Sequence, residues 1–112
     1  MVLLIVGSRS IKECDLEKHV PPETEMIITG GAEGVDTIAE RYADKKRLSK
    51  LVLRPQYSLY GKSAPLKRNE KMVELCDMAL IVWDGCSRGT NHTIKYAKKL
   101  NKKIVIITNH NI

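Results

Sequence analysis

The sequence predicts an α/β fold with a parallel sheet between two layers of helices. Short apolar runs alternate with amphipathic helix patterns along the chain, which is the order that parallel sheets require. Three of the runs end at a glycine-rich or small polar loop, and a helix pattern follows each loop. No hairpin signal joins any two runs, so each strand is expected to return through a right-handed crossover.

Five apolar runs supply the strands of the expected sheet. We place them at residues 2–6, 26–29, 51–53, 79–83 and 104–108. The first run is continuously apolar, as expected of a strand that is buried on both faces. A strand order of 3-2-1-4-5 gives a Rossmann-like three-layer sandwich with a five-stranded, mostly parallel sheet. Its switch point lies between strands one and four, where ligands bind beyond the carboxyl ends.

Helix patterns fill most of the intervals between the strands. We expect a short helix over 11–20, ended by Pro21-Pro22, and a longer one over 66–76 after a loop at 56–64. The helix between the second and third strands has an apolar face at i, i+3, i+4, i+7 and i+8, made by Val35, Ile38, Ala39, Tyr42 and Ala43. The inner faces of the last two helices are expected to comprise Asn69, Met72, Val73 and Cys76, and then Thr93, Ile94, Ala97 and Leu100.

Length and composition predict one globular domain over residues 1–112. Hydrophobic residues make up 43% of the 112 residues and charged residues 29%, which is ordinary for a folded domain of this size. No apolar run approaches the ~20 residues of a membrane-spanning helix. The apolar start lacks the basic region and cleavage site of a signal peptide, so we interpret it as the first strand.

Three widely spaced cysteines argue against a disulfide framework or a zinc site. Cys14, Cys76 and Cys86 form no C-x-x-C pair, and an odd number of cysteines fits a reducing cytoplasm. The net charge is +6. Such a charge attracts nucleotides, nucleic acids or acidic partners, although most lysine clusters near helix ends are simply a solvated face. We therefore expect a cytoplasmic protein without a metal.

The three loops after strands one, two and four are the candidate ligand site. A glycine-lined turn from strand to helix brings backbone N–H groups and the positive end of a helix dipole close to an anion. The spacing of Gly30, Gly31 and Gly34 matches neither the G-x-G-x-x-G motif nor a P-loop. The candidate residues are Gly7, Ser8, Gly30, Gly31, Gly34, Ser87, Gly89 and Thr90. Helix capping alone also explains Ser87 or Thr90.

Two arginines are the candidates for bidentate contacts with a phosphate. Arg9 lies in the first loop, and Arg68 precedes Asn69 on a helix. A planar guanidinium matches two phosphate oxygens at once. Asn69 falls on the apolar side of its helix, where a buried amide needs partners. We therefore expect Arg9, Arg68 and Asn69 in the ligand site.

Two aspartates are candidates for contacts with a sugar. Asp36 lies in the first turn of its helix, and the favourable position near the positive end of the helix dipole is enough to explain an aspartate there. Its carboxylate could also accept hydrogen bonds from ribose hydroxyls or orient Arg9. Asp84, at the tip of strand four, is the candidate catalytic carboxylate. No second carboxylate is clearly paired with it, so a glycosidase-like pair is not visible.

Other side chains have both a structural and a functional interpretation. Tyr57 and Tyr60 could stack on a base, or form a lid or a dimer contact. Trp83 fits core packing better than base stacking, and His92 lies off the buried side of its helix. Cys86 lies near a helix start, which could lower the pKa of its thiol, but no base partner is evident.

Taken together, these stretches resemble the SLOG superfamily, and are most similar to its small YspA/YpsA-like branch. The resemblance is carried by residues 7–9, 30–36, 60–62, 64–72, 83–85 and 87–90. It implies a Rossmann-like domain with a nucleotide or nucleotide-derived ligand at the strand ends. The related LOG-type enzymes release ribose 5′-phosphate from a nucleotide with an Arg and the Glu of P-G-G-x-G-T-x-x-E. Gly89 and Thr90 match the G-T here, but the glutamate position falls on Thr93.

Three functions follow as hypotheses. The first is binding of a small phosphorylated ligand such as an ADP-ribose or NAD relative, or a nucleoside monophosphate. The second is N-glycoside hydrolysis or transfer on nucleotides, with Asp84 or Asp36 as the carboxylate; Thr93 cannot replace a catalytic carboxylate in this chemistry. The third is nucleic-acid binding, since residues 30–36 also resemble DNA-processing protein A, although aromatic platforms are few. The resemblance also implies a homodimer.

Overall fold

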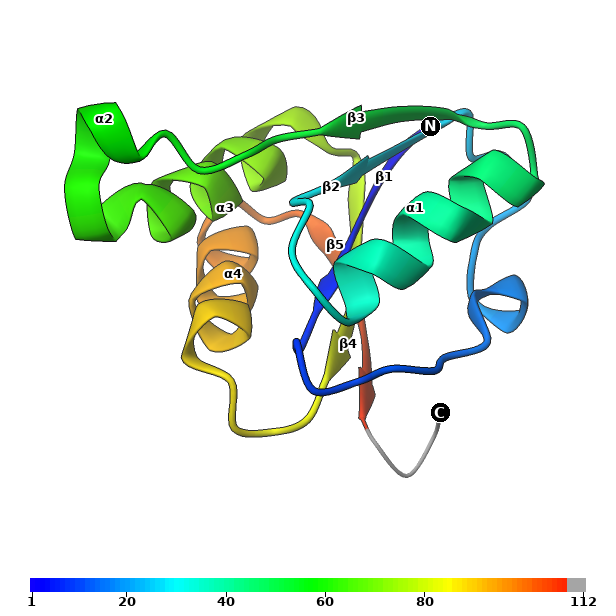
Figure 1. Ribbon diagram of the computed structural model, residues 1–112. Coiled ribbons are helices and arrows are strands. Elements are labelled where there is room, and N and C mark those ends of the chain that lie inside the picture. Colours follow the sequence, from blue (N-terminus) through cyan, green and yellow to red (C-terminus); the bar gives the residue numbers. More distant parts are fainter. Residues whose placement is uncertain (109–112) are drawn as a thin grey trace.

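The computed structural model describes residues 1–108 and confirms the α/β class, with a five-stranded sheet flanked by helices (Figure 1). The strand order is β3-β2-β1-β4-β5, and each pair of neighbouring strands is parallel. Residues 109–112 of the domain expected over 1–112 lie outside the described residues. The elements in chain order are β1 (Val2–Gly7), the 3₁₀ turn η1 (Leu16–Lys18), β2 (Met26–Thr29), α1 (Val35–Lys45), β3 (Ser49–Val52), α2 (Tyr57–Tyr60), the 3₁₀ turn η2 (Gly61–Ser63), α3 (Ala64–Leu75), β4 (Met78–Trp83), α4 (Arg88–Lys99) and β5 (Lys103–Thr108).

Two hydrophobic clusters, one on each face of the sheet, make the three layers. Successive side chains of a strand point to opposite faces, so Leu3 and Ile5 of β1 pack on the side of α1, while Leu4 packs on the side of α3 and α4. All three are fully buried. Figure 1 shows α1 on one side of the sheet and the pair α3 and α4 on the other. The central strands thus have the two buried faces that their continuous apolar runs predicted.

The prediction of a helix over 11–20 is wrong, because only the turn η1 forms there. Ile11 and Leu16 are both buried in the cluster beneath α1, yet residues five apart would lie about 140° apart on a helix. A mostly non-helical segment lets both side chains reach the same core. The Asp15 carboxylate caps η1 by accepting the Glu17 N–H at 3.1 Å.

The segment expected to be a loop over 56–64 contains α2 and η2, and α3 begins two residues earlier than expected. Pro65 lies in the first turn of α3, where its missing N–H costs no hydrogen bond. A second correction concerns Leu100, which is 36% exposed at the end of α4 and not part of the buried face. The third strand is an edge strand that starts at Ser49, and three of its four residues are exposed.

None of the helices within residues 1–108 has the length and apolar content that crossing a bilayer requires.

Candidate functional site

A cavity of about 430 Å³ lies at the carboxyl ends of β1, β2 and β4, between the start of α3 and the start of α4. This is the edge of the sheet where the switch point was expected. Most of the residues predicted for the site line this single cavity, namely Gly7, Arg9, Gly30, Gly31, Asp36, Arg68, Asn69, Ser87, Gly89 and Thr90. Residues that are far apart in the sequence therefore meet at one place.

Three predicted residues, Ser8, Gly34 and Asp84, do not line the cavity and instead hold its loops in shape. The buried Ser8 hydroxyl accepts the Asp84 N–H at 2.9 Å. Gly34 has φ +76° and ψ −125°, and a Cβ there would lie 2.5 Å from the Ser8 carbonyl oxygen. Only glycine fits this junction between the first and second loops.

The β2 loop (residues 30–34) presents carbonyl groups to cations. Arg68 Nη1 donates to the carbonyl oxygen of Gly30 and, at 3.2 Å, to that of Leu53. Arg54 Nη1 donates to the Gly31 carbonyl oxygen at 3.0 Å. The Ala32 N–H donates to Asp36 Oδ2 at 3.2 Å. The N–H of Ala32 is therefore used within the protein.

Asp36 and Arg68 perturb each other at the centre of the site. Burial raises the pKa of Asp36 above its usual range, while the Ala32 N–H and the positive charge of Arg68 oppose that rise. Burial also lowers the pKa of Arg68, and Asp36 opposes that fall. The guanidinium is held by Asn69 Oδ1, which accepts from Nε at 2.7 Å. Within residues 1–108, Nη2 of Arg68 makes no hydrogen bond, so it is available to a ligand.

The β4 loop (residues 84–87) is built around the Asp84 carboxylate. Asp84 Oδ1 accepts the N–H groups of Cys86 and Ser87 at 2.8 and 2.9 Å. These backbone hydrogen bonds lower the pKa of Asp84 to about 2. Asp84 Oδ2 also accepts the Ser10 hydroxyl at 3.0 Å. An ionised carboxylate with these partners caps a turn, and it lies outside the cavity in which a substrate would be held.

The start of α4 provides the amides that can meet an anion. Ser87 caps the helix through its hydroxyl oxygen, which accepts the Thr90 N–H at 3.4 Å. The N–H groups of Arg88 and Gly89 belong to the first turn and have no acceptor within the helix. A Cβ at Gly89 would meet only Asn69 Nδ2, at 3.9 Å, so the backbone is open to the cavity here. The start of α4 thus has the open first-turn amides that an anion site at a helix N-terminus requires.

Several residues of the site were not predicted. Tyr57 and Thr93 line the cavity, although the sequence left Tyr57 open between base stacking and a lid. The other unpredicted lining residues are Val6, Ala32, Pro55, Pro65 and Leu66. Arg54, which donates to the Gly31 carbonyl oxygen beside the cavity, follows β3 and so lies outside the three loops in which the sequence placed the site.

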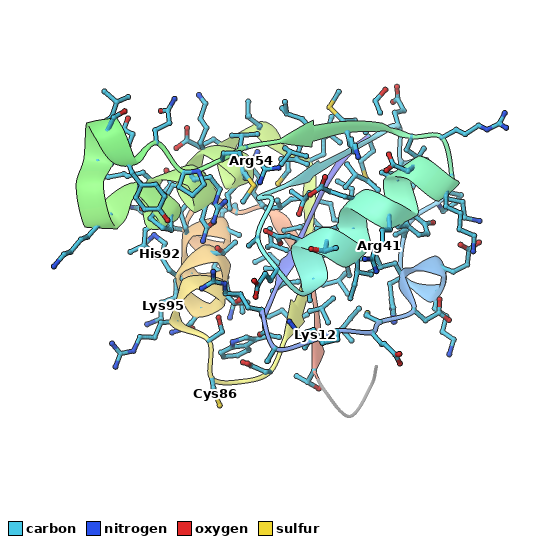
Figure 2. The ribbon with its side chains drawn as sticks, viewed as in Figure 1. Lys12, Arg41, Arg54, Cys86, His92 and Lys95 are labelled. Atoms are coloured by element: carbon cyan, nitrogen blue, oxygen red, sulfur yellow. The ribbon has the colours of Figure 1, made fainter. Side chains whose placement is uncertain are left out.

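The remaining side chains with two interpretations lie away from the cavity. Trp83 packs against the core and donates from Nε1 to the Ser87 carbonyl oxygen at 3.2 Å. His92 lies 2.9 Å from Glu70 Oε2, across the interface between α3 and α4. Cys86 is exposed in the β4 loop, at the opposite end of the loop from the strand (Figure 2). For Trp83 the packing interpretation is confirmed.

Comparison with known proteins gives one informative relationship. The chain is 31% identical to the Gene 61 protein of Mycobacterium phage D29 over 116 residues, which span 92% of this chain and 93% of the relative. The chain belongs to the family of that phage protein. No family model matches the chain, and no solved structure matches it. The name of that phage protein states no ligand.

The donor set of this family member's cavity is suited to an anion and not to a metal. Asp36 is the one carboxylate among its described lining residues, against the guanidinium groups of Arg9 and Arg68. In residues 1–108, no three His, Cys, Asp or Glu side chains come close enough together to hold a metal ion. What the arrangement can do is bind negative charge through two guanidinium groups and a helix start.

Proposed function

We propose that this protein binds a nucleotide or nucleotide-derived phosphorylated ligand in the cavity at the carboxyl ends of β1, β2 and β4. The observation that carries the proposal is the convergence of two guanidinium groups and the first turn of α4 on one cavity. Asp36, the one carboxylate among the lining residues within 1–108, is buried and accepts the Ala32 N–H. The cavity therefore favours an anion over a cation.

Each group has a distinct part in the proposed complex. The open N–H groups of Arg88 and Gly89 face a phosphate along the helix dipole. Arg68 is already oriented by Asn69 and Gly30, so it offers Nη2 without losing side-chain freedom on binding. Arg9 is exposed at the rim and closes on the ligand from the β1 side. Tyr57, which is 61% exposed beside the cavity, supplies an apolar ring for a base.

Binding without hydrolysis is the form of the proposal that the site supports best. Thr93 occupies the position of the LOG-type glutamate, and its hydroxyl donates to the Gly89 carbonyl oxygen at 3.0 Å. A threonine so engaged cannot act as a carboxylate base. Asp84, the other candidate, lies outside the cavity lining. We therefore rank N-glycoside chemistry and nucleic-acid binding below ligand binding, and membership of the SLOG superfamily is part of the same proposal.

Isothermal titration calorimetry with a panel of AMP, ADP, ADP-ribose, NAD and ribose 5-phosphate tests this function. We expect saturable binding of at least one nucleotide. An Arg9→Ala/Arg68→Lys double variant should weaken it at least about tenfold, since the first change removes a charge-assisted contact and the second removes the bidentate guanidinium. Lys95→Ala is the matched control, because Lys95 is an exposed cation on α4 that lines no part of the cavity (Figure 2). Failure of the whole panel to bind would overturn the proposal.

The same samples separate the enzymatic alternative from binding. Nucleotides incubated with the protein and analysed by chromatography should show no free base. Release of base that Asp84→Asn or Asp36→Asn abolishes would favour the N-glycosidic function instead.

A further inference from the structure

A second cavity, of about 570 Å³, lies beside the first and has no part in the proposed contacts so far. It is formed by the segment that follows β3, by α2 and by the outer face of α3, and is lined there by Arg54, Tyr60, Lys67 and Lys71. Arg68 lines both cavities. The side chain that we propose to contact a phosphate therefore borders both cavities.

Two arginines beside the shared edge of the cavities are anchored on the β2 loop. Arg54 lines the second cavity and donates to the carbonyl oxygen of Gly31, which lines the first. Arg68 is anchored in the same manner on Gly30. Burial lowers the pKa of Arg68, and the positive charge of Arg54 adds to that fall. An anion bound beside both guanidinium groups would stabilise their charged forms.

The second cavity itself carries an excess of positive charge. Four cationic side chains line it against two carboxylates, Glu70 and Glu74. Both carboxylates have partners on α4: Glu70 pairs with His92 at 2.9 Å, and Glu74 accepts the Tyr96 hydroxyl at 2.8 Å. Within residues 1–108, Lys67 and Lys71 have no ion-pair partner. These two lysines are four residues apart on one helix face, a spacing at which like charges repel.

We propose that the second cavity is an anion subsite for a second phosphoryl group of the ligand, held by Arg54, Lys67 and Lys71. The inference rests on the proposed function of the first cavity. It narrows the ligand class to nucleotides that carry two linked phosphates, such as a nucleoside diphosphate or its sugar ester. A ligand with a single phosphate occupies the first cavity alone and leaves the repulsion between Lys67 and Lys71 unrelieved.

The test compares AMP with ADP by isothermal titration calorimetry at low ionic strength, where such contacts are least screened. The readout is the ratio of the two dissociation constants. In the wild type we expect ADP to bind about tenfold more tightly than AMP, as one additional charge-assisted group would give. In a Lys67→Ala/Lys71→Ala variant the ratio should fall toward one, whereas a Lys95→Ala/Lys99→Ala variant should keep the wild-type ratio.

The outcomes separate this inference from the proposed function. Equal affinities for AMP and ADP in the wild type would overturn the second subsite and leave the first cavity's function standing. A preference for ADP that survives the loss of Lys67 and Lys71 would also overturn it, because the second phosphate would then lie elsewhere. Binding of neither nucleotide, nor of any other panel member, would overturn both proposals. Circular dichroism of each variant shows that it is folded.

Discussion

The β2 loop and the β4 loop both connect a central strand to a helix, yet their backbones have different partners and lead to different groups at the cavity. In the β2 loop, the carbonyl oxygens of Gly30 and Gly31 bind arginines, and the Ala32 N–H binds Asp36. In the β4 loop, Asp84 takes the N–H groups of the turn, and the helix that follows begins with open amides.

This difference shows that a glycine-rich turn is not in itself an anion site. The glycines of the β2 loop make room for side chains: a Cβ at Gly30 would lie 2.7 Å from Arg68 Nη1 and 2.8 Å from Asp36 Oδ2. Gly89, at the start of α4, has no such neighbour. The β2 loop therefore positions the cation, whereas α4 supplies the amides. Four predictions test this division, from the largest expected change in stability to the smallest.

The largest change is expected from Gly34→Ala, compared with Gly85→Ala. Both glycines have positive φ, but only at Gly34 would the new Cβ clash, with the carbonyl oxygens of Ser8 and Arg9. We expect Gly34→Ala to cost about 3–5 kcal/mol, from backbone strain and overpacking together. Gly85→Ala should cost only ~1–2 kcal/mol, from the left-handed backbone alone. Urea unfolding measures both, and equal costs would contradict the close contact of the first two loops.

The next largest change is expected from Arg68→Ala, compared with Arg9→Ala. Loss of Arg68 removes the donor to the carbonyl oxygens of Gly30 and Leu53 and leaves buried Asp36 without its nearby positive charge. A cost of about 2–4 kcal/mol is expected for unmaking charged hydrogen bonds of this kind. Arg9 is exposed, and its loss should change the free energy of unfolding by less than ~0.5 kcal/mol. If Arg68→Ala left the free energy of unfolding unchanged, the β2 loop would not be held by this side chain.

A smaller effect, on the pH dependence of the free energy of unfolding, distinguishes Asp84 of the β4 loop from Asp36, which binds the β2 loop. The pKa of Asp84 in the folded protein is about 2, below its unfolded value of ~3.9. Its stabilising contribution is therefore complete above the unfolded pKa and is lost as the pH falls through the folded pKa. Asp36 has the opposite sign: its raised folded pKa makes folding more favourable as the pH falls.

Urea unfolding between about pH 6 and pH 2 measures these contributions. Asp84→Asn should lose less stability on acidification than the wild type, and Asp36→Asn should lose more. Parallel curves for the wild type and Asp84→Asn would mean that the turn amides of Cys86 and Ser87 do not depend on the charge of Asp84.

The smallest change in stability, with a sign opposite to the others, is expected from Gly89→Ala. Alanine is favoured over glycine inside a helix by about 0.5–1 kcal/mol, and the new Cβ finds no close neighbour. The same methyl group would stand in the proposed path of a phosphate to the α4 amides. We expect a more stable protein that binds nucleotide about tenfold more weakly, as loss of a charge-assisted contact would give. Unchanged affinity would remove α4 from the site.

The sequence predicted the sheet because its signals are local. Continuous apolar runs such as residues 2–6 identify buried parallel strands, and the helix patterns between them leave few topologies. The prediction for segment 11–20 failed because residues five apart, such as Ile11 and Leu16, lie on one face of neither a helix nor a strand. Their burial depends on the sheet beneath them, which no local pattern contains.

The sequence also predicted which residues gather at the cavity better than it predicted what they do there. Parallel strands end at one edge, so residues after β1, β2 and β4 had to meet. Which groups of those residues face the ligand depends on contacts between distant segments. Arg68 reaches Gly30 across 38 positions, and Asp84 reaches Ser10 across 74. Such pairings decide whether a loop offers its amides or its carbonyl oxygens, and they follow only from the assembled fold.

The most direct measurement of this division is a two-dimensional ¹H–¹⁵N NMR titration of the whole protein with ADP. We predict saturable shifts of the amide signals of Arg88 and Gly89 and of the Arg68 guanidinium signals, with the Ala32 amide little changed because Asp36 already holds it. Shifts led by Ala32 and its neighbours in the β2 loop, with Arg88 and Gly89 unmoved, would contradict the account.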